Sequence, residues 1–120
     1  MEAGPAQGEQ PLDSSADVRW GRLADVVPVA GEDFHPLASL GDARIEHIVS
    51  SDTPDHGEQV QEWDEWVVVL RGAASLDIAG VDHDLGPGDW VLIPAGTRHQ
   101  VRTTERGTHW IAVHGGAVQR

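Results

Sequence analysis

The sequence predicts an all-β protein, and three observations carry that prediction. Short apolar runs recur at close intervals between residues 58 and 114, which is typical of strands. Glycine and proline stand between these runs, as in Gly86-Pro87-Gly88-Asp89, where they mark turns. No run shows a sustained helical periodicity. Many short strands joined by tight turns are typical of a sandwich or a barrel.

The N-terminal segment differs in composition from the rest of the chain. Residues 1–17 carry four acidic residues, no basic residue and almost nothing large and apolar. Such a segment cannot bury enough apolar surface to offset the entropy lost on ordering. We therefore predict a short disordered tail at residues 1–17 and a single β-barrel domain at residues 18–120.

The order of the expected strands follows from the same signals. Early strands are expected at residues 26–29 and 44–50, with a loop around Phe34, His35 and Pro36 between them. A long strand is expected at residues 59–71, followed by Gly72. The remaining expected strands are 74–78 and 81–85, which flank Ala79-Gly80 as a hairpin, then 90–93, 99–103 and 109–114.

One expected strand is apolar on both faces. Residues 65–70 place Val67 and Val69 on one side, and Trp66, Val68 and Leu70 on the other. A half-exposed strand alternates apolar and polar residues, so this strand is expected to be covered on both sides. An N-terminal strand of the same chain or a second subunit would supply the second cover. If a second subunit supplies this cover, the protein is a homodimer.

Composition excludes several classes of partner. The net charge is −12, which argues against nucleic acid and against an anionic membrane surface. No run is long enough for a transmembrane helix, and no N-terminal stretch has the form of a signal peptide. The chain contains no cysteine, which fits a reducing interior. A cytoplasmic protein is therefore expected.

The most specific motif runs from Gly88 to His99. It reads G-x5-P-x-G-x2-H, in which Pro94 and Gly96 end a short strand and a histidine opens the next one. This pattern resembles the second signature of the cupin superfamily, small β-barrels that often hold a metal in the barrel mouth. Glu65, followed six residues later by Gly72, resembles the end of the first cupin signature, G-x5-H-x-H-x3,4-E-x6-G. The resemblance implies a cupin-type, RmlC-like jelly-roll β-barrel.

The first signature departs from the cupin pattern at its two histidines. The corresponding residues here are Gln59 and Gln61, which strand alternation places on the same face as Glu65. Trp63 shares this predicted face; core packing is the favoured interpretation, and a pocket wall is the alternative. The chain is similar to a subset of small cupins that also ends in a strand like Trp110-Ile111-Ala112-Val113-His114. The residues that match this subset are Gln61, Glu65, His99 and His114.

The chemistry of this set points to a weak metal site. Glu65 and His99 supply a carboxylate and an imidazole, both of which suit a divalent transition metal. The amide oxygen of Gln61 is a weaker ligand. An inward-facing His114 would complete two histidines and one carboxylate, but His109 and His114 have opposite parity and the sequence does not decide which faces inward. The predicted metal ligands are Gln61, Glu65, His99 and His114, with iron, manganese, nickel or zinc weakly bound.

Two functions follow from these residues. The first is a small cupin that binds a divalent metal and acts on a small organic molecule. The second is a metal-free cupin that binds a small molecule or regulates, without catalysis, in which Glu65 and His99 form an acid/base pair or recognise a ligand. The sequence leaves open whether the protein is an enzyme, and it does not name a substrate.

Overall fold

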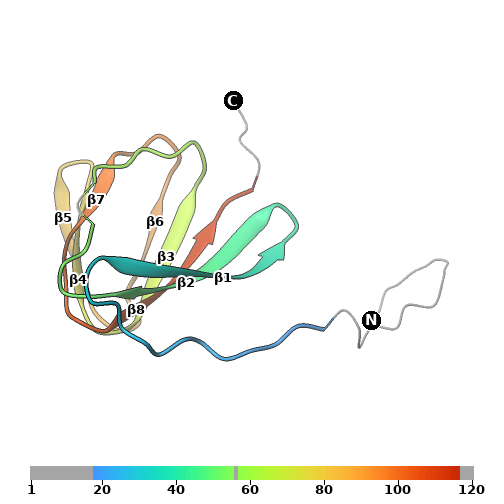
Figure 1. The fold of residues 1–120 in the computed structure, drawn as a ribbon. Coiled ribbons are helices and arrows are strands. Elements are labelled where there is room, and N and C mark those ends of the chain that lie inside the picture. Colours follow the sequence, from blue (N-terminus) through green and yellow to red (C-terminus); the bar gives the residue numbers. More distant parts are fainter. Residues whose placement is uncertain (1–17, 56, 117–120) are drawn as a thin grey trace.

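The all-β prediction is confirmed by the computed structural model, which describes residues 18–55 and 57–116. The tail predicted at residues 1–17 lies outside the described residues. Across the described ranges every regular element is a strand, and no helix there could cross a membrane. Two antiparallel sheets curve around a common interior and form a jelly roll (Figure 1).

The strands divide unequally between the two sheets. The larger sheet has the order β1-β2-β8-β3-β6, and the smaller sheet has the order β5-β4-β7. The strands of the larger sheet are β1 (Glu32–Leu40), β2 (Ala43–Ser50), β8 (Thr108–His114), β3 (Glu65–Arg71) and β6 (Trp90–Ile93). The strands of the smaller sheet are β5 (Val81–Leu85), β4 (Ala74–Ile78) and β7 (His99–Thr104).

The core lies between the inward faces of the two sheets. Val67, Val69 and Trp110 from the larger sheet pack with Leu76 and Leu85 from the smaller one. Successive side chains of a strand point to opposite faces, so each strand contributes every second residue to this core. The same alternation fixes which polar side chains enter the interior.

The strands after residue 70 agree closely with the prediction. The hairpin of β4 and β5 and the short strand β6 begin and end at the predicted residues. Strand β7 is one residue longer than expected, and β8 begins one residue earlier. Before residue 70, β2 also begins one residue earlier than expected. These strands lie between glycine and proline turns, so local chemistry defines their ends.

The expected strand at residues 26–29 and the expected loop around Phe34 are both wrong. Residues 26–29 form no strand, and Val29 is 91% exposed, because Pro28 lacks a backbone donor and no neighbouring strand pairs with this segment. Phe34 instead lies in β1. Pro36 is accommodated there because β1 is an edge strand and its register shifts directly after Pro36.

The long strand expected at residues 59–71 begins only at Glu65. Gln59 forms an isolated bridge with His99, in which the Gln59 amide donates to the His99 carbonyl at 2.8 Å and the His99 amide donates back at 3.0 Å. The Gly96 amide donates to the Gln61 carbonyl at 2.7 Å. The backbone of residues 59–61 therefore pairs with the start of β7 and does not continue β3.

Gly72 follows β3 at a position that admits only glycine. Its φ is +92°, and a Cβ built there would lie 2.7 Å from the Cα of Thr108. A real Cβ cannot approach backbone this closely, so β8 would have to shift. This contact gives a physical reason for the glycine in the Glu65-x6-Gly72 spacing.

We expect Gly72→Ala to lower the free energy of unfolding by about 2 kcal/mol or more, because steric overlap adds to the strain of a positive φ. Gly80→Ala is the matched control, since Gly80 has a φ of +85° but nothing within 4 Å of its built Cβ. The control should lose about 1 kcal/mol from backbone strain alone. Urea denaturation measures both variants. Equal losses would show that the overlap with Thr108 does not matter.

The outer face of the larger sheet carries a buried histidine pair. His47 is fully buried and His109 is 4% exposed, with 2.9 Å between His47 Nε2 and His109 Nδ1. Arg71 Nη2 donates to His109 Nε2 at 3.2 Å, so a neutral His109 carries its proton on Nδ1 and donates to His47. Burial is the main cause that lowers the pKa of His47, and the positive charges of His109 and His35 lower it further. Burial and Arg71 lower the pKa of His109, while Asp25 opposes them.

This pair should make the fold sensitive to acid. Both folded-state pKa values lie below the ordinary value of 6.5, so the unfolded chain binds more protons than the folded chain as the pH falls. The contribution of the pair is fully present above pH 6.5 and is lost progressively below it. We expect His47→Gln to flatten the fall in free energy of unfolding between about pH 7 and pH 5, where histidine titrates. His83→Gln in β5 is the control, and an equally flattened profile there would refute the assignment.

Candidate functional site

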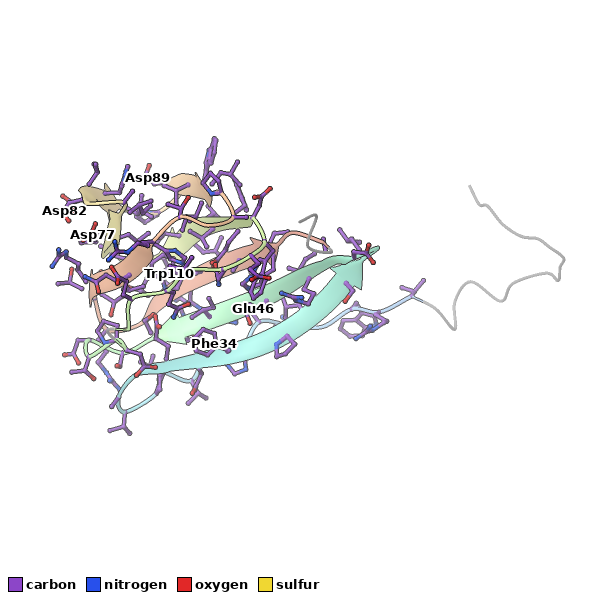
Figure 2. The ribbon with its side chains drawn as sticks, turned by 90° about the horizontal axis from the view of Figure 1, so that it is seen from above. Phe34, Glu46, Asp77, Asp82, Asp89 and Trp110 are labelled. Atoms are coloured by element: carbon purple, nitrogen blue, oxygen red, sulfur yellow. The ribbon has the colours of Figure 1, made fainter. Side chains whose placement is uncertain are left out.

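A cavity of about 300 Å³ lies inside the barrel between the two sheets. Apolar side chains such as Val67, Leu76 and Ile93 form part of its wall. Glu46 and Trp110, which also line it, project from the larger sheet toward the interior (Figure 2). All four predicted site residues line this cavity: Gln61, Glu65, His99 and His114.

His99 faces Glu65 across the cavity with one ring nitrogen free to accept. The turn that contains Gly96, at a φ of +82°, brings His99 to the first position of β7. His99 Nδ1 lies 2.9 Å from the carbonyl oxygen of Thr97, which can only accept, so Nδ1 carries a proton. In the neutral ring the lone pair is therefore on Nε2, 3.8 Å from Glu65 Oε1. Both side chains are about nine-tenths buried.

The separation of 3.8 Å is too long for a direct hydrogen bond. Two acceptors at this distance are suited to share a hydrogen-bond donor or a cation. The geometry of Glu65 and His99 is therefore suited to a ligand hydroxyl, a proton or a metal ion held between the two acceptors. We call these two residues the Glu65–His99 pair below.

His114 also faces the barrel interior, which decides the question that strand parity left open. Trp63 Nε1–H donates to His114 Nδ1 at 3.0 Å, so this nitrogen carries the lone pair. His114 Nε2 then carries the proton and donates to Glu46 Oε1 at 2.7 Å. Both ring nitrogens of His114 are thus occupied by protein partners. His109 faces the opposite side of the sheet, beside His47.

Gln61 brings an unpaired oxygen to the same cavity. Its Oε1 atom is buried and has no hydrogen-bond partner among the described residues. A buried amide oxygen without a partner is costly, and a bound donor or cation would satisfy it. Gln59 also lines the cavity, although its backbone bridge to His99 and not strand alternation places it there.

The donor set fits a weakly held divalent metal. Glu65 and His99 are the two strong donors, and the Gln61 amide oxygen is a weaker third. Within residues 18–55 and 57–116 no three His, Cys, Asp or Glu side chains converge as a metal site. His114 would have to leave both Trp63 and Glu46 before its nitrogens could bind a metal. The four-residue metal site predicted from the sequence remains a prediction.

Sequence reasoning missed three carboxylates that line the cavity, those of Glu32, Glu46 and Asp55. Ser50 Oγ donates to Glu32 Oε2 at 2.5 Å, and Trp110 Nε1 donates to Ser50 Oγ at 3.0 Å. Burial raises the pKa of Glu32, the Ser50 hydroxyl opposes it, and the charge of Asp55 adds to the rise. Strand alternation within residues 44–50 places Glu46 on the same face as the apolar Ile48. This pattern could have predicted that Glu46 faces the interior. Glu32 carried no signal, because its strand was predicted as a loop.

Trp63 is not part of the core cluster and lines the wall of a pocket, which was the alternative interpretation of the sequence. It does not line the barrel cavity but lines the adjoining groove, where the Arg44 guanidinium carbon lies 5.2 Å from its ring centroid. Its indole N–H is the partner that fixes the tautomer of His114. Trp63 therefore connects the groove to the cavity.

Comparison with known proteins identifies the family. The family described as "Cupin domain" matches residues 46–114, which is more than half of the chain. The chain belongs to the cupin family. The expected resemblance is thus confirmed, and the match begins at Glu46 and ends at His114, the two partners of one hydrogen bond in the cavity.

Several solved structures share the fold of this cupin. A Ralstonia eutropha protein described as a "putative mannose-6-phosphate isomerase" is 36% identical, with a TM-score of 0.70 over 83% of this chain and 100% of that chain. KdgF from Halomonas sp. is 19% identical (TM-score 0.67, 88% of this chain and 90% of that chain). An RmlC-like cupin from Shewanella frigidimarina is 16% identical (TM-score 0.69, 82% and 89%). The last two comparisons bear on the fold alone. A search of curated proteins found no match.

Proposed function

We propose that this cupin binds a small polar organic molecule in its barrel cavity and moves a proton on it at the Glu65–His99 pair. One observation carries the proposal: His99 Nε2 offers a buried lone pair 3.8 Å from a buried carboxylate oxygen, beside the unpaired amide oxygen of Gln61. These groups are arranged to accept hydrogen bonds from a hydroxylated or carbonyl-bearing ligand.

The geometry supports His99 as the proton acceptor. The Thr97 carbonyl holds the Nδ1 proton, so the ring can take a second proton at Nε2 without changing orientation. Glu65 stabilises the imidazolium that forms, because its oxygen lies 3.8 Å from the protonated nitrogen. On the opposite wall His114 presents a proton that it donates to Glu46. The name of the Ralstonia protein makes sugars the ligands to test first, with isomerisation by proton transfer as the candidate reaction.

Metal-dependent chemistry is the second candidate, and the donor set of Glu65, His99 and Gln61 favours it. Iron, manganese, nickel or zinc would be weakly held by the carboxylate and His99 Nε2, with the amide oxygen assisting. A bound metal would polarise a ligand carbonyl or hydroxyl as a Lewis acid. A binding or regulatory role without catalysis uses the same cavity and differs only in lacking turnover.

The cytoplasm is the compartment in which we propose that this cupin acts.

The test is ligand-dependent thermal stability of the chain prepared without a histidine tag and in EDTA. The probes are D-glucose, D-fructose, D-mannose and D-xylose, each at concentrations up to saturation. A ligand of the native state raises Tm by mass action. We expect a rise with at least one sugar, its loss in His99→Ala and in Glu65→Gln, and its retention in the control His83→Ala.

The outcomes separate the two candidates. A rise that persists in EDTA supports the metal-free pair. A rise in Tm that needs added Mn²⁺, Ni²⁺ or Zn²⁺, and that is lost in His99→Ala, favours metal-dependent chemistry. If the sugars act equally on wild type and His99→Ala, the Glu65–His99 pair is not the binding centre.

We also propose that this cupin forms a homodimer through the outer face of β3 and β6. Trp66 and Trp90 lie there with their ring centroids 6.1 Å apart, and Trp90, Leu92 and Leu70 are 59%, 54% and 43% exposed. The sequence allowed an N-terminal strand as the cover, but no strand precedes Glu32 in the described part of the chain. A contiguous exposed apolar patch on a sheet favours a protein partner, and a second copy is the partner with a matching surface.

Light scattering after size exclusion tests the dimer. We expect wild type to have about twice the monomer mass and Leu92→Glu to have about the monomer mass, because a buried unpaired carboxylate is strongly unfavourable in an apolar interface. Val81→Glu is the control, since Val81 is 58% exposed on β5 in the other sheet. A monomeric wild type, or a dimeric Leu92→Glu variant, would contradict the proposal.

A further inference from the structure

A groove of about 480 Å³ adjoins the barrel cavity and shares Glu46 and His114 with it. Two arginines, Arg19 and Arg44, line this groove together with Trp63. The hydrogen-bonded pair of Glu46 and His114 therefore lies at the boundary that the groove and the cavity share. A molecule that reaches across this pair would contact both chambers.

Arg44 is held in the groove by an aromatic ring. Its guanidinium carbon lies 5.2 Å from the centroid of Trp63, and the indole N–H of Trp63 is fixed by its hydrogen bond to His114. A guanidinium that lies over a ring keeps the N–H groups at its edge available, and these groups match a phosphate or a carboxylate. Several other arginines have carboxylate partners instead. These ion pairs are Arg71–Asp25, Arg98–Glu58 and Arg102–Asp77.

The charge of the cavity is opposite to that of the groove. Four carboxylates line the cavity, from Glu32, Glu46, Asp55 and Glu65, and no arginine is among its described lining residues. The chain contains no lysine. In a cavity removed from water, these carboxylates repel an anionic group more strongly than they would in bulk solvent. An anionic ligand would be accepted only if its charged group lay outside the cavity.

We propose that the groove at Arg44 and Arg19 is an anion subsite, and that this cupin binds a small hydroxylated molecule that carries one phosphate or carboxylate group. The anionic group lies against Arg44, and the neutral, hydroxylated part extends past Glu46 and His114 to the Glu65–His99 pair. The substrate class rests on the proposed function of the cavity, whereas the anion subsite rests on the groove alone. Arg44 is thus a specificity-determining residue.

The anion subsite is tested directly with inorganic phosphate. In ¹H–¹⁵N NMR spectra we expect the Trp63 indole signal, assigned by its loss in Trp63→Phe, to shift saturably with phosphate at constant ionic strength set by chloride. Arg44→Gln should weaken this response by at least about tenfold, because it removes the charge and the paired donors. Arg98→Gln is the matched control, since Arg98 pairs with Glu58 elsewhere on the surface, and it should respond as wild type does. Acetate, titrated in the same way, distinguishes a carboxylate site from a phosphate site.

The substrate class is tested with matched sugars. We expect glucose 6-phosphate or glucuronate to bind at least about tenfold more tightly than glucose, and Arg44→Gln to remove the difference. His99→Ala should weaken all three sugars while leaving the response to inorganic phosphate intact. No saturable shift at Trp63 with either phosphate or acetate, or equal shifts in wild type and Arg44→Gln, would overturn the subsite. A phosphate response without any sugar binding would retain the subsite and overturn the proposed function and the substrate class.

Discussion

The paired backbone hydrogen bonds between Gln59 and His99 hold the segment before β3 against the first residue of β7. These bonds place Gln61 and His99 beside Glu65, although the three residues lie on a loop and on two different sheets. A further bond from the Gly96 amide to the Gln61 carbonyl, at 2.7 Å, ties the turn before β7 to the same segment. The candidate site thus depends on a bridge that makes no use of side-chain chemistry.

The two histidines of the cavity show how a neighbour decides what an imidazole can do. A carbonyl of Thr97 fixes the proton of His99 on Nδ1 and leaves a lone pair at Nε2. An indole N–H of Trp63 fixes the lone pair of His114 on Nδ1 and leaves a proton at Nε2. The two rings, which come from different sheets, therefore differ at Nε2, where His99 carries a lone pair and His114 carries a proton that it donates to Glu46.

Charge is also divided between the cavity and the groove. The chain has a net charge of −12, and four of its carboxylates line the cavity, where burial raises the pKa of Glu32. Arg44 lies over Trp63 in the adjoining groove, which shares Glu46 and His114 with the cavity. For the proposed ligand, this division is a stronger constraint than the volume of either chamber, since carboxylates disfavour an anionic group in the cavity and arginines favour it in the groove.

By itself the sequence determined the all-β class, the strands after residue 70 and the position of His99, because glycine and proline at turns such as Pro94 to Gly96 act on their immediate neighbours. Tertiary structure alone decided that residues 59–61 leave the path of β3, that Pro36 lies within an edge strand, and that His114 faces inward. It also decided the tautomers of both cavity histidines and added the carboxylates of Glu32, Glu46 and Asp55 to the cavity. These outcomes depend on hydrogen bonds between residues far apart in the chain, such as the 68 positions between Glu46 and His114, which local periodicity does not encode.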